Sequence, residues 1–134
     1  MWDLRAGSRG GLCALTLAGH SCIVRCLSAC ESGDNTIVSG GDDGNLKVWD
    51  LRSTTGGSRA TLCGHTAAVT TVRWDWSKIV SGSADCTVRV WDVSSGPHAA
   101  RTCGVRCPVN AVELHERYVA ACGFDGIRVL RGSA

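Results

Sequence analysis

The stretch from Ile79 to Val93, IVSGSADCTVRVWDV, decides the fold, because an earlier stretch from Ile37 to Leu51, IVSGGDDGNLKVWDL, follows the same pattern. In each copy, β-branched and aliphatic residues lead to a Ser-Gly pair, and an acidic residue among small neighbours follows. An alternating run then ends at Trp-Asp. Such a pattern is typical of two strands joined by a tight turn. Two copies in one chain define a repeat.

The spacing of the two copies indicates the architecture. Trp49 and Trp91 are 42 residues apart, and so are Asp43 and Asp85. A period of about 40–45 residues with several short strands is typical of β-propeller blades. The chain is therefore predicted to be an array of blades.

A third and weaker copy, YVAACGFDGIRVL, runs from Tyr118 to Leu130, with Leu130 where the other copies have tryptophan. The first residues, Met1-Trp2-Asp3-Leu4, resemble the end of a further copy. We therefore predict one partial propeller domain over residues 1–134. Its repeats are expected at about 12–52, 59–93 and 99–131, with residues 1–11 as the tail of a preceding repeat.

Each predicted repeat contains four short strands in meander order. One strand of each period is expected at residues 12–17, 59–63 and 99–103, and the next at 23–30, 68–76 and 108–114. The remaining two flank the acidic turn. The predicted fold class is all-β, with about three four-stranded antiparallel blades in an incomplete ring.

Composition and charge exclude several classes of function. The chain has 134 residues, of which 44% are hydrophobic, and this is ample for a core. A formal net charge of +2 is too small to indicate nucleic-acid or membrane binding, and no apolar run reaches the roughly 18 residues of a membrane span. A cytoplasmic or nuclear protein is expected.

The nine cysteines contain no Cys-x-x-Cys pair, so no metal site is predicted. Without a secretory signal they are expected to be reduced thiols, several of them on strand faces. Glycine clusters lack the spacing of phosphate-binding loops. No cofactor is implied.

The order Gly-His, Ser-Gly, turn aspartate and Trp-Asp occurs in both complete copies, and in this the chain resembles the WD40-repeat family over essentially its whole length. The resemblance implies a buried hydrogen-bonded tetrad in each well-formed repeat. The tetrads would be His20, Ser39, Asp43 and Trp49 in the first repeat, and His65, Ser81, Asp85 and Trp91 in the second. Indole, hydroxyl, imidazole and carboxylate groups can satisfy one another in this order when buried.

The third repeat has lost most of this set. Its corresponding residues are Val105, Ala121, Asp125 and Leu130, so three of the four partners are absent. We expect this blade to be the least stable, with Asp125 only shaping its turn.

Serine, histidine and aspartate are also the residues of a hydrolase triad. However, no Gly-x-Ser-x-Gly sequence surrounds Ser39 or Ser81, and a structural tetrad explains why the set occurs twice in register. The chain is therefore not predicted to be an enzyme.

Three repeats are too few to close a ring, because propellers have typically 4–8 blades. An open arc leaves apolar surface and strand edges bare on its first and last blades. We therefore expect a truncated or partial form of a longer propeller protein, for which having no autonomous function is one alternative. Self-association through the open edges is another.

Partner-binding residues are predicted on the rims of the array, because WD40 proteins bind partners there. By analogy with relatives that bind peptides, one rim is expected to carry Arg25, Asp42, Thr70, Ala84, Asn110 and Phe124. Arg25 is the leading anchor, since a guanidinium suits a carboxylate or phosphate. A solvated arginine fits the sequence equally well.

The opposite rim carries a more specific resemblance. Residues 37–52, IVSGGDDGNLKVWDLR, match the pattern of WD40 substrate receptors of cullin-4 ubiquitin ligases, which ends in Trp-Asp-x-Arg. Arg52 supplies that arginine, and Arg5 repeats the ending. A weaker resemblance is to F-box WD40 proteins. The sequence thus predicts a scaffold that binds proteins or peptides, with a ligase substrate receptor bound to a cullin-4 adaptor as its specific form.

Overall fold

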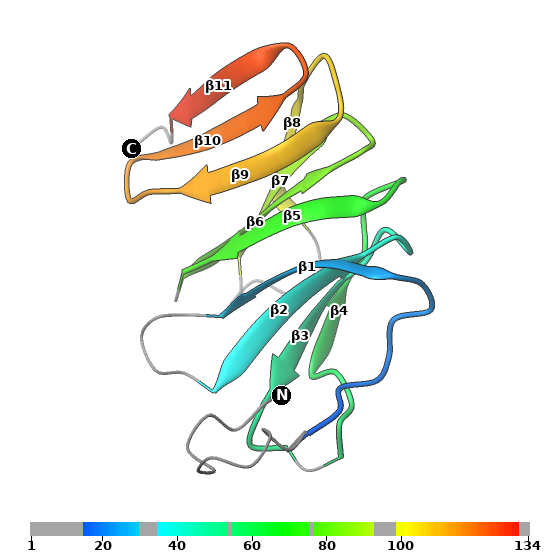
Figure 1. The fold of residues 1–134 in the computed structure, drawn as a ribbon. Coiled ribbons are helices and arrows are strands. Elements are labelled where there is room, and N and C mark those ends of the chain that lie inside the picture. The colour runs from blue at the N-terminus through cyan, green and yellow to red at the C-terminus, as the bar shows by residue number, and fades with distance from the viewer. Residues whose placement is uncertain (1–14, 30–34, 54, 76, 93–98, 132–134) are drawn as a thin grey trace, which may run out of the picture.

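The computed structural model describes residues 15–29, 35–53, 55–75, 77–92 and 99–131, which form antiparallel sheets (Figure 1). The first sheet, or blade, contains β1 (Val24–Ala29), β2 (Thr36–Gly41), β3 (Leu46–Asp50) and β4 (Ala60–Leu62). The second contains β5 (Val69–Trp74), β6 (Lys78–Ser83), β7 (Thr87–Asp92) and β8 (Ala99–Gly104). The third contains β9 (Val109–Leu114), β10 (Tyr118–Gly123) and β11 (Gly126–Arg131).

Each sheet is a meander in which consecutive strands pair. The strand orders are β1-β2-β3-β4, β5-β6-β7-β8 and β9-β10-β11. The sheets lie side by side as blades, with β1 against β5 and β5 against β9 (Figure 1). The predicted all-β blade architecture is confirmed, although the third sheet has three strands among the described residues where four were expected. No helix in the described part of the chain is long and apolar enough to cross a membrane.

Two apolar clusters lie between neighbouring blades. The first joins Val38, Leu46, Val48 and Leu62 of the first blade to Val69, Val72, Ile79 and Trp91 of the second. The second joins Val80 and Val88 of the second blade to Val109, Val112, Val119 and Ala121 of the third. Successive side chains of a strand point to opposite faces, so Ile79 and Val80 enter different clusters. The middle blade is therefore packed on both faces.

Close packing between the blades depends on two glycines. A Cβ at Gly40 would lie 2.5 Å from Val69 Cγ1, and a Cβ at Gly82 would lie 2.4 Å from Val109 Cγ1. Only glycine therefore lets the first strand of the next blade come this close. The third blade has Cys122 at the corresponding position.

Large apolar side chains are exposed at both ends of the arc. At one end these are Ile23, Val24 and Leu27, and at the other they are Tyr118, Phe124, Ile127 and Val129. In the middle blade, by contrast, the corresponding strand faces are covered by neighbours. Self-association through these ends stays a prediction.

The strand predicted at 12–17 is wrong for the residues that the structure describes. Residues 15–17 form no strand, and the Ala18 N–H donates to the carbonyl of Gly56 (3.2 Å). A strand needs a neighbouring ladder to satisfy its backbone groups, and no described strand pairs with this segment. Residues 12–14 and the predicted tail at 1–11 lie outside the described residues.

Candidate functional site

The first blade contains a chain of hydrogen bonds through its predicted tetrad. Trp49 Nε1–H donates to Ser39 Oγ (2.8 Å). Ser39 Oγ lies 2.8 Å from His20 Nε2, and His20 Nδ1 lies 2.9 Å from Asp43 Oδ2. Because a carboxylate only accepts, Nδ1 carries the proton and the serine hydroxyl donates to Nε2. Each polar group of the set is satisfied.

The second blade repeats this arrangement with the same distances to within 0.1 Å. Trp91 Nε1–H donates to Ser81 Oγ (2.8 Å), which lies 2.8 Å from His65 Nε2. His65 Nδ1 lies 2.8 Å from Asp85 Oδ2. Burial lowers the pKa of His65 below its ordinary value even though Asp85 acts in the opposite direction. The imidazole is therefore held neutral, as the hydrogen-bond directions require.

The two aspartates join the loop before each blade to the hairpin of that blade. Ser21 N–H and Thr66 N–H donate to Asp43 and Asp85, respectively. Burial alone would raise the pKa of Asp85, but bonds from Thr87, His65 and Thr66 outweigh it and lower the pKa to about 2. The sequence pattern did not single out these backbone donors.

This geometry is structural and unsuited to nucleophilic catalysis. Ser81 is 0% exposed and Ser39 is 6% exposed, and each hydroxyl lies between an indole N–H and an imidazole. A nucleophile must reach its substrate. Within the described residues, neither serine has the access that a hydrolase needs.

Glycines before the histidines pack against the tryptophans. A Cβ at Gly19 would lie 3.2 Å from the Trp49 Cη2 atom, and a Cβ at Gly64 would lie 3.2 Å from that of Trp91. Before the third blade, a Cβ at Gly104, the last residue of β8, would meet no atom within 4 Å. Leu130 and Val105 replace the larger aromatic side chains there, so the contact is missing.

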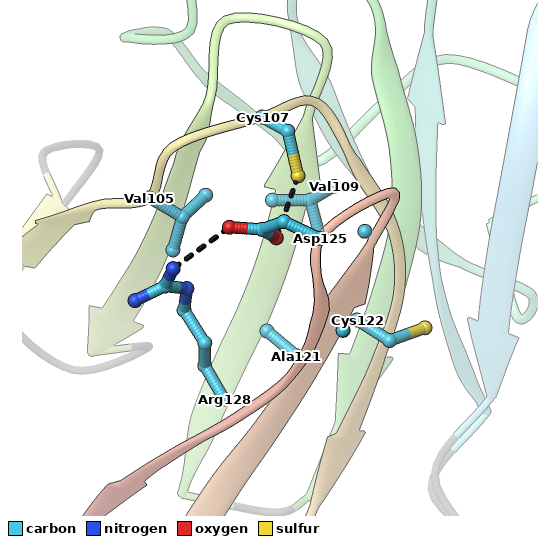
Figure 2. Close-up of a pocket in the computed structure, with 9 residues that line it drawn as sticks. Val105, Cys107, Val109, Ala121, Cys122, Asp125 and Arg128 are labelled. Atoms are coloured by element: carbon cyan, nitrogen blue, oxygen red, sulfur yellow. Dashed lines mark hydrogen bonds and ion pairs between the residues drawn. The ribbon is translucent and has the colours of Figure 1, made fainter.

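The third blade holds its loop and hairpin together differently, and this corrects the expectation that Asp125 only shapes its turn. The Cys107 thiol donates to Asp125 Oδ1 (2.9 Å), and the Arg128 guanidinium donates to Oδ2 (2.7 Å) (Figure 2). Val105 and Ala121 lie beside this group, whereas the side chain of Cys122 points away from it. The hydrogen bonds from Cys107 and Arg128 lower the pKa of Asp125.

A shorter hairpin explains why Arg128 reaches Asp125. In the first blade, the paired residues Gly40 and Leu46 enclose residues 41–45, whereas Cys122 and Ile127 of the third blade enclose only 123–126. Gly126 has φ +117°, a conformation that favours glycine. Cys107 and Arg128 were not predicted as partners of Asp125.

On the rim that contains the β2–β3 turn, Arg25 is already paired. Its Nε and Nη2 atoms donate to the two carboxylate oxygens of Asp42 at 2.6 and 2.9 Å. The side chains are 53% and 24% exposed, respectively. The pair raises the pKa of Arg25 and lowers that of Asp42. An acidic ligand would have to compete with Asp42 for this guanidinium.

The other predicted residues of this rim differ in accessibility. The Thr70 hydroxyl lies within hydrogen-bond distance of the carbonyls of Gly82 and Val109, so it is turned into the junction between blades. Ala84 is half-buried, and Asn110 is exposed. Phe124 is 96% exposed at the tip of the β10–β11 hairpin.

On the opposite rim, Arg52 follows β3 and pairs with Asp50 of the Trp-Asp dipeptide. Arg52 Nε and Nη2 donate to the two carboxylate oxygens, both at 3.0 Å. These bonds lower the pKa of Asp50. The Arg52 side chain is 65% exposed. Arg5, the second predicted contact, lies outside the described residues.

The seven cysteines in the described part of the chain are all free thiols. The thiol of Cys26 packs between the first two blades, near the carbonyls of Gly40 and Val69. Burial raises the pKa of this thiol to about 11. Cys26 therefore fills space in a blade junction.

Comparison with known families agrees with these repeats. Residues 11–50 and 56–92 match the family described as WD domain, G-beta repeat, and together they make up more than half of the chain. The chain belongs to the WD40 family of β-propeller repeat proteins.

Its relatives are varied WD40 proteins. The chain is 37% identical over 60 residues to the katanin p80 WD40 repeat-containing subunit B1 homolog KTN80.2 of Arabidopsis thaliana, covering 45% of this chain and 5% of the relative. It is 34% identical over 55 residues to methylosome protein WDR77 of Xenopus laevis, covering 41% and 16%. It is 36% identical over 52 residues to the Denticleless protein homolog of Gallus gallus, covering 39% and 7%. The chain thus spans only a small part of each relative.

Proposed function

We propose that this chain is a protein–protein interaction scaffold whose Arg52 rim binds the adaptor of a cullin-4 ubiquitin ligase. WD40 repeats form rigid platforms, and their function depends on surface side chains. The Asp50–Arg52 ion pair is the observation that carries the proposed binding to the cullin-4 adaptor. It gives the arginine of the Trp-Asp-x-Arg pattern a defined side-chain geometry.

Asp50 prepares Arg52 for binding. Two parallel hydrogen bonds fix the plane of the guanidinium, and the Arg52 backbone N–H also donates to Asp50 Oδ1 (3.0 Å). A long side chain that is already ordered loses less conformational entropy on binding. An acidic or polar group of a partner would share this guanidinium with Asp50, just as an acidic ligand would share that of Arg25 with Asp42.

The opposite rim is proposed to contact the protein that the scaffold presents. It carries the Arg25–Asp42 pair, the exposed Asn110 and the isolated aromatic ring of Phe124. Exposed aromatic and arginine side chains are common binding hot spots. Thr70 does not contribute its hydroxyl to this surface. The proposal includes a cytoplasmic or nuclear location, where such ligases act.

Co-precipitation with the purified cullin-4 adaptor tests the proposal. Arg52→Glu should weaken capture by about tenfold or more, because it puts a negative charge at the contact. The double variant Arg5→Glu with Arg52→Glu should weaken it further. Arg106→Glu is the matched control, since Arg106 is exposed in the loop before β9 on the other rim. If the folded wild-type chain fails to capture the adaptor, the receptor proposal is wrong.

A further inference from the structure

Lysine is scarce in this chain. Of its 14 lysine and arginine residues, only Lys47 and Lys78 are lysines. The primary amine of lysine accepts acyl groups once it has lost its proton, whereas the guanidinium of arginine stays protonated in proteins. Acylation of a lysine in this sequence must therefore fall on one of these two residues.

The amine of Lys47 is engaged inside the first blade. Its Nζ donates to Thr61 Oγ1 of β4 (3.0 Å), and this hydrogen bond is partly buried. The Cδ and Cε atoms of its stem lie 3.6 Å from the position of a Cβ at Gly19, and the ring of Trp49 lies 3.2 Å from the same point. A reagent reaches this amine only after the side chain has left these contacts. Such local opening slows modification.

The amine of Lys78 is held more loosely, at the start of β6. Its side chain is 32% exposed, and its Nζ lies 3.4 Å from Asp75 Oδ2. The other carboxylate oxygen of Asp75, Oδ1, accepts hydrogen bonds from the backbone N–H groups of Ser77 and Lys78 and from the Ser77 hydroxyl. Those bonds hold the turn, so the ion pair can open while the backbone stays in place. Ion pairs at the surface contribute little stability, and Lys78 is therefore the accessible amine.

Lys78 lies on the Arg52 rim. It stands opposite Asp92, the last residue of β7, just as Thr36 stands opposite Asp50, the last residue of β3. Asp50 is the residue that holds Arg52. A stable interface takes roughly 20–30 residues from each partner. A protein bound at Arg52 would therefore extend over the neighbouring blade, where Lys78 lies.

We propose that Lys78 is the lysine of this chain that accepts an acyl group from a thioester donor, and that its acylation blocks the Arg52 rim. The deprotonated amine attacks the thioester carbonyl, a C–N bond forms and the C–S bond breaks. The sulfur leaves as a thiol with the proton that the nitrogen loses. The product has no positive charge at Lys78. The block of the rim rests on the proposed adaptor binding, whereas the choice of lysine does not.

Limited acetylation of the full chain with sulfo-N-hydroxysuccinimide acetate, followed by peptide mass spectrometry, tests the choice of lysine. Lys78 should react about tenfold faster than Lys47, because local opening must precede reaction at Lys47. Lys78→Arg keeps the charge but should remove most of the lysine acetylation, whereas Lys47→Arg should leave it nearly unchanged. Equal rates at the two lysines, or faster reaction of Lys47, would overturn the proposal.

Two thioester donors distinguish the source of the acyl group. Acetyl-coenzyme A at mildly alkaline pH leaves an acetyl group, and a ubiquitin-charged conjugating enzyme leaves a Gly-Gly remnant after trypsin digestion. The product of the effective donor should form at Lys78 before Lys47. Absence of both products from Lys78 would overturn the thioester step.

Capture of the purified cullin-4 adaptor tests the effect on the rim. Lys78→Gln, which imitates the uncharged acylated side chain, should weaken capture by about threefold or more, whereas Lys78→Arg should leave it unchanged. Bound adaptor should also protect Lys78 from the acetylating reagent. Equal capture by Lys78→Gln and the wild-type chain would overturn the block of the rim alone. A wild-type chain that captures no adaptor would overturn it together with the receptor proposal, while the acetylation rates still decide the choice of lysine.

Discussion

The second and third blades show two ways of holding the same strands together. In the second blade, His65, Ser81, Asp85 and Trp91 form a buried chain of hydrogen bonds, and both faces of the sheet are packed. In the third blade, an exposed carboxylate joins a thiol to a guanidinium, and one face carries exposed apolar side chains.

The difference separates what the fold requires from what stabilises it. Both blades keep an aspartate that ties the preceding loop to the hairpin, through Thr66 in one and Cys107 in the other. Only the second blade adds a tryptophan that fills the junction with the blade before it. Buried hydrogen bonds stabilise more than exposed ion pairs, which contribute about 0–1 kcal/mol. The third blade is therefore expected to open first.

The largest expected loss of stability comes from replacing the tetrad serine of the second blade with the alanine that the third blade has at that position. Ser81→Ala, which corresponds to Ala121, removes the partner of both the Trp91 N–H and the His65 Nε2. Each stranded group costs about 1–3 kcal/mol, so for two groups we expect a loss of about 2–6 kcal/mol. Urea denaturation measures it. Ser39→Ala should cause a similar loss in the first blade. A loss below about 1 kcal/mol for both variants would show that the hydrogen-bonded tetrads contribute little to stability.

A smaller loss of stability is expected when a methyl group is added at the close contact between the second and third blades. Gly82→Ala puts a Cβ 2.4 Å from Val109 Cγ1 and 2.8 Å from Thr71 Cγ2, so the blades must move apart. Overpacking of this kind costs about 1–3 kcal/mol. Cys122→Ala changes the same position of the third blade and should stay within about 0.5 kcal/mol. Equal urea midpoints for the two variants would show that the glycine is not what permits the contact.

Acid should destabilise the second blade through His65 and Asp85. The pKa of His65 lies below its ordinary 6.5, and that of Asp85 lies at about 2 instead of 3.8, so the unfolded chain binds protons more readily at both residues. Stability should therefore begin to fall below about pH 6.5 and continue to fall from about pH 4 to 2. With solvent screening taken into account, Asp85 contributes about 1 kcal/mol to this loss of stability. Urea midpoints across this range should fall less steeply below pH 4 for Asp85→Asn than for Asp125→Asn.

The smallest expected difference in stability is between alanine variants of Gly64 and Gly104, the glycines that precede the second and third blades. Gly64→Ala would place a Cβ 2.6 Å from the Arg89 guanidinium, which can move, and 3.2 Å from the buried Trp91 ring, which cannot move easily. We expect a loss of about 1 kcal/mol. Gly104→Ala meets nothing and should be neutral within about 0.5 kcal/mol. Thermal melting of the two variants compares them directly, and a larger loss for Gly104→Ala would contradict the account.

The fold could be predicted because its signals are local and repeated. Alternating apolar residues and the turn residues near Ser39 and Ser81 predict the two strands of each hairpin. The repeated order of histidine, serine, aspartate and tryptophan predicts the tetrad of each blade. The strand prediction was wrong for residues 15–17 because a strand depends on a neighbour, which local sequence does not reveal.

Pairings between side chains were harder to foresee. Arg25 and Asp42 were both assigned to the rim, but their mutual bonds follow from the way the loop before β1 meets the β2–β3 turn. Thr70 was expected on the surface, whereas a bulge in the β5–β6 pairing lies between Val69 and Thr71, and its hydroxyl points to backbone carbonyls. Asp125 pairs with Arg128 because the hairpin of the third blade is one residue shorter than that of the first blade. A comparison of hairpin lengths could have indicated this.

The central claim is that Ser81 couples Trp91 to the rest of the second blade through shared hydrogen bonds. A double-mutant cycle of Ser81→Ala and Trp91→Phe in urea tests it most directly. Each single change strands a buried partner, whereas the double change removes both ends of the Trp91–Ser81 bond. We predict that the double variant loses less than the sum of the single losses, by about 1 kcal/mol or more. Additive losses, within about 0.3 kcal/mol, would contradict the account.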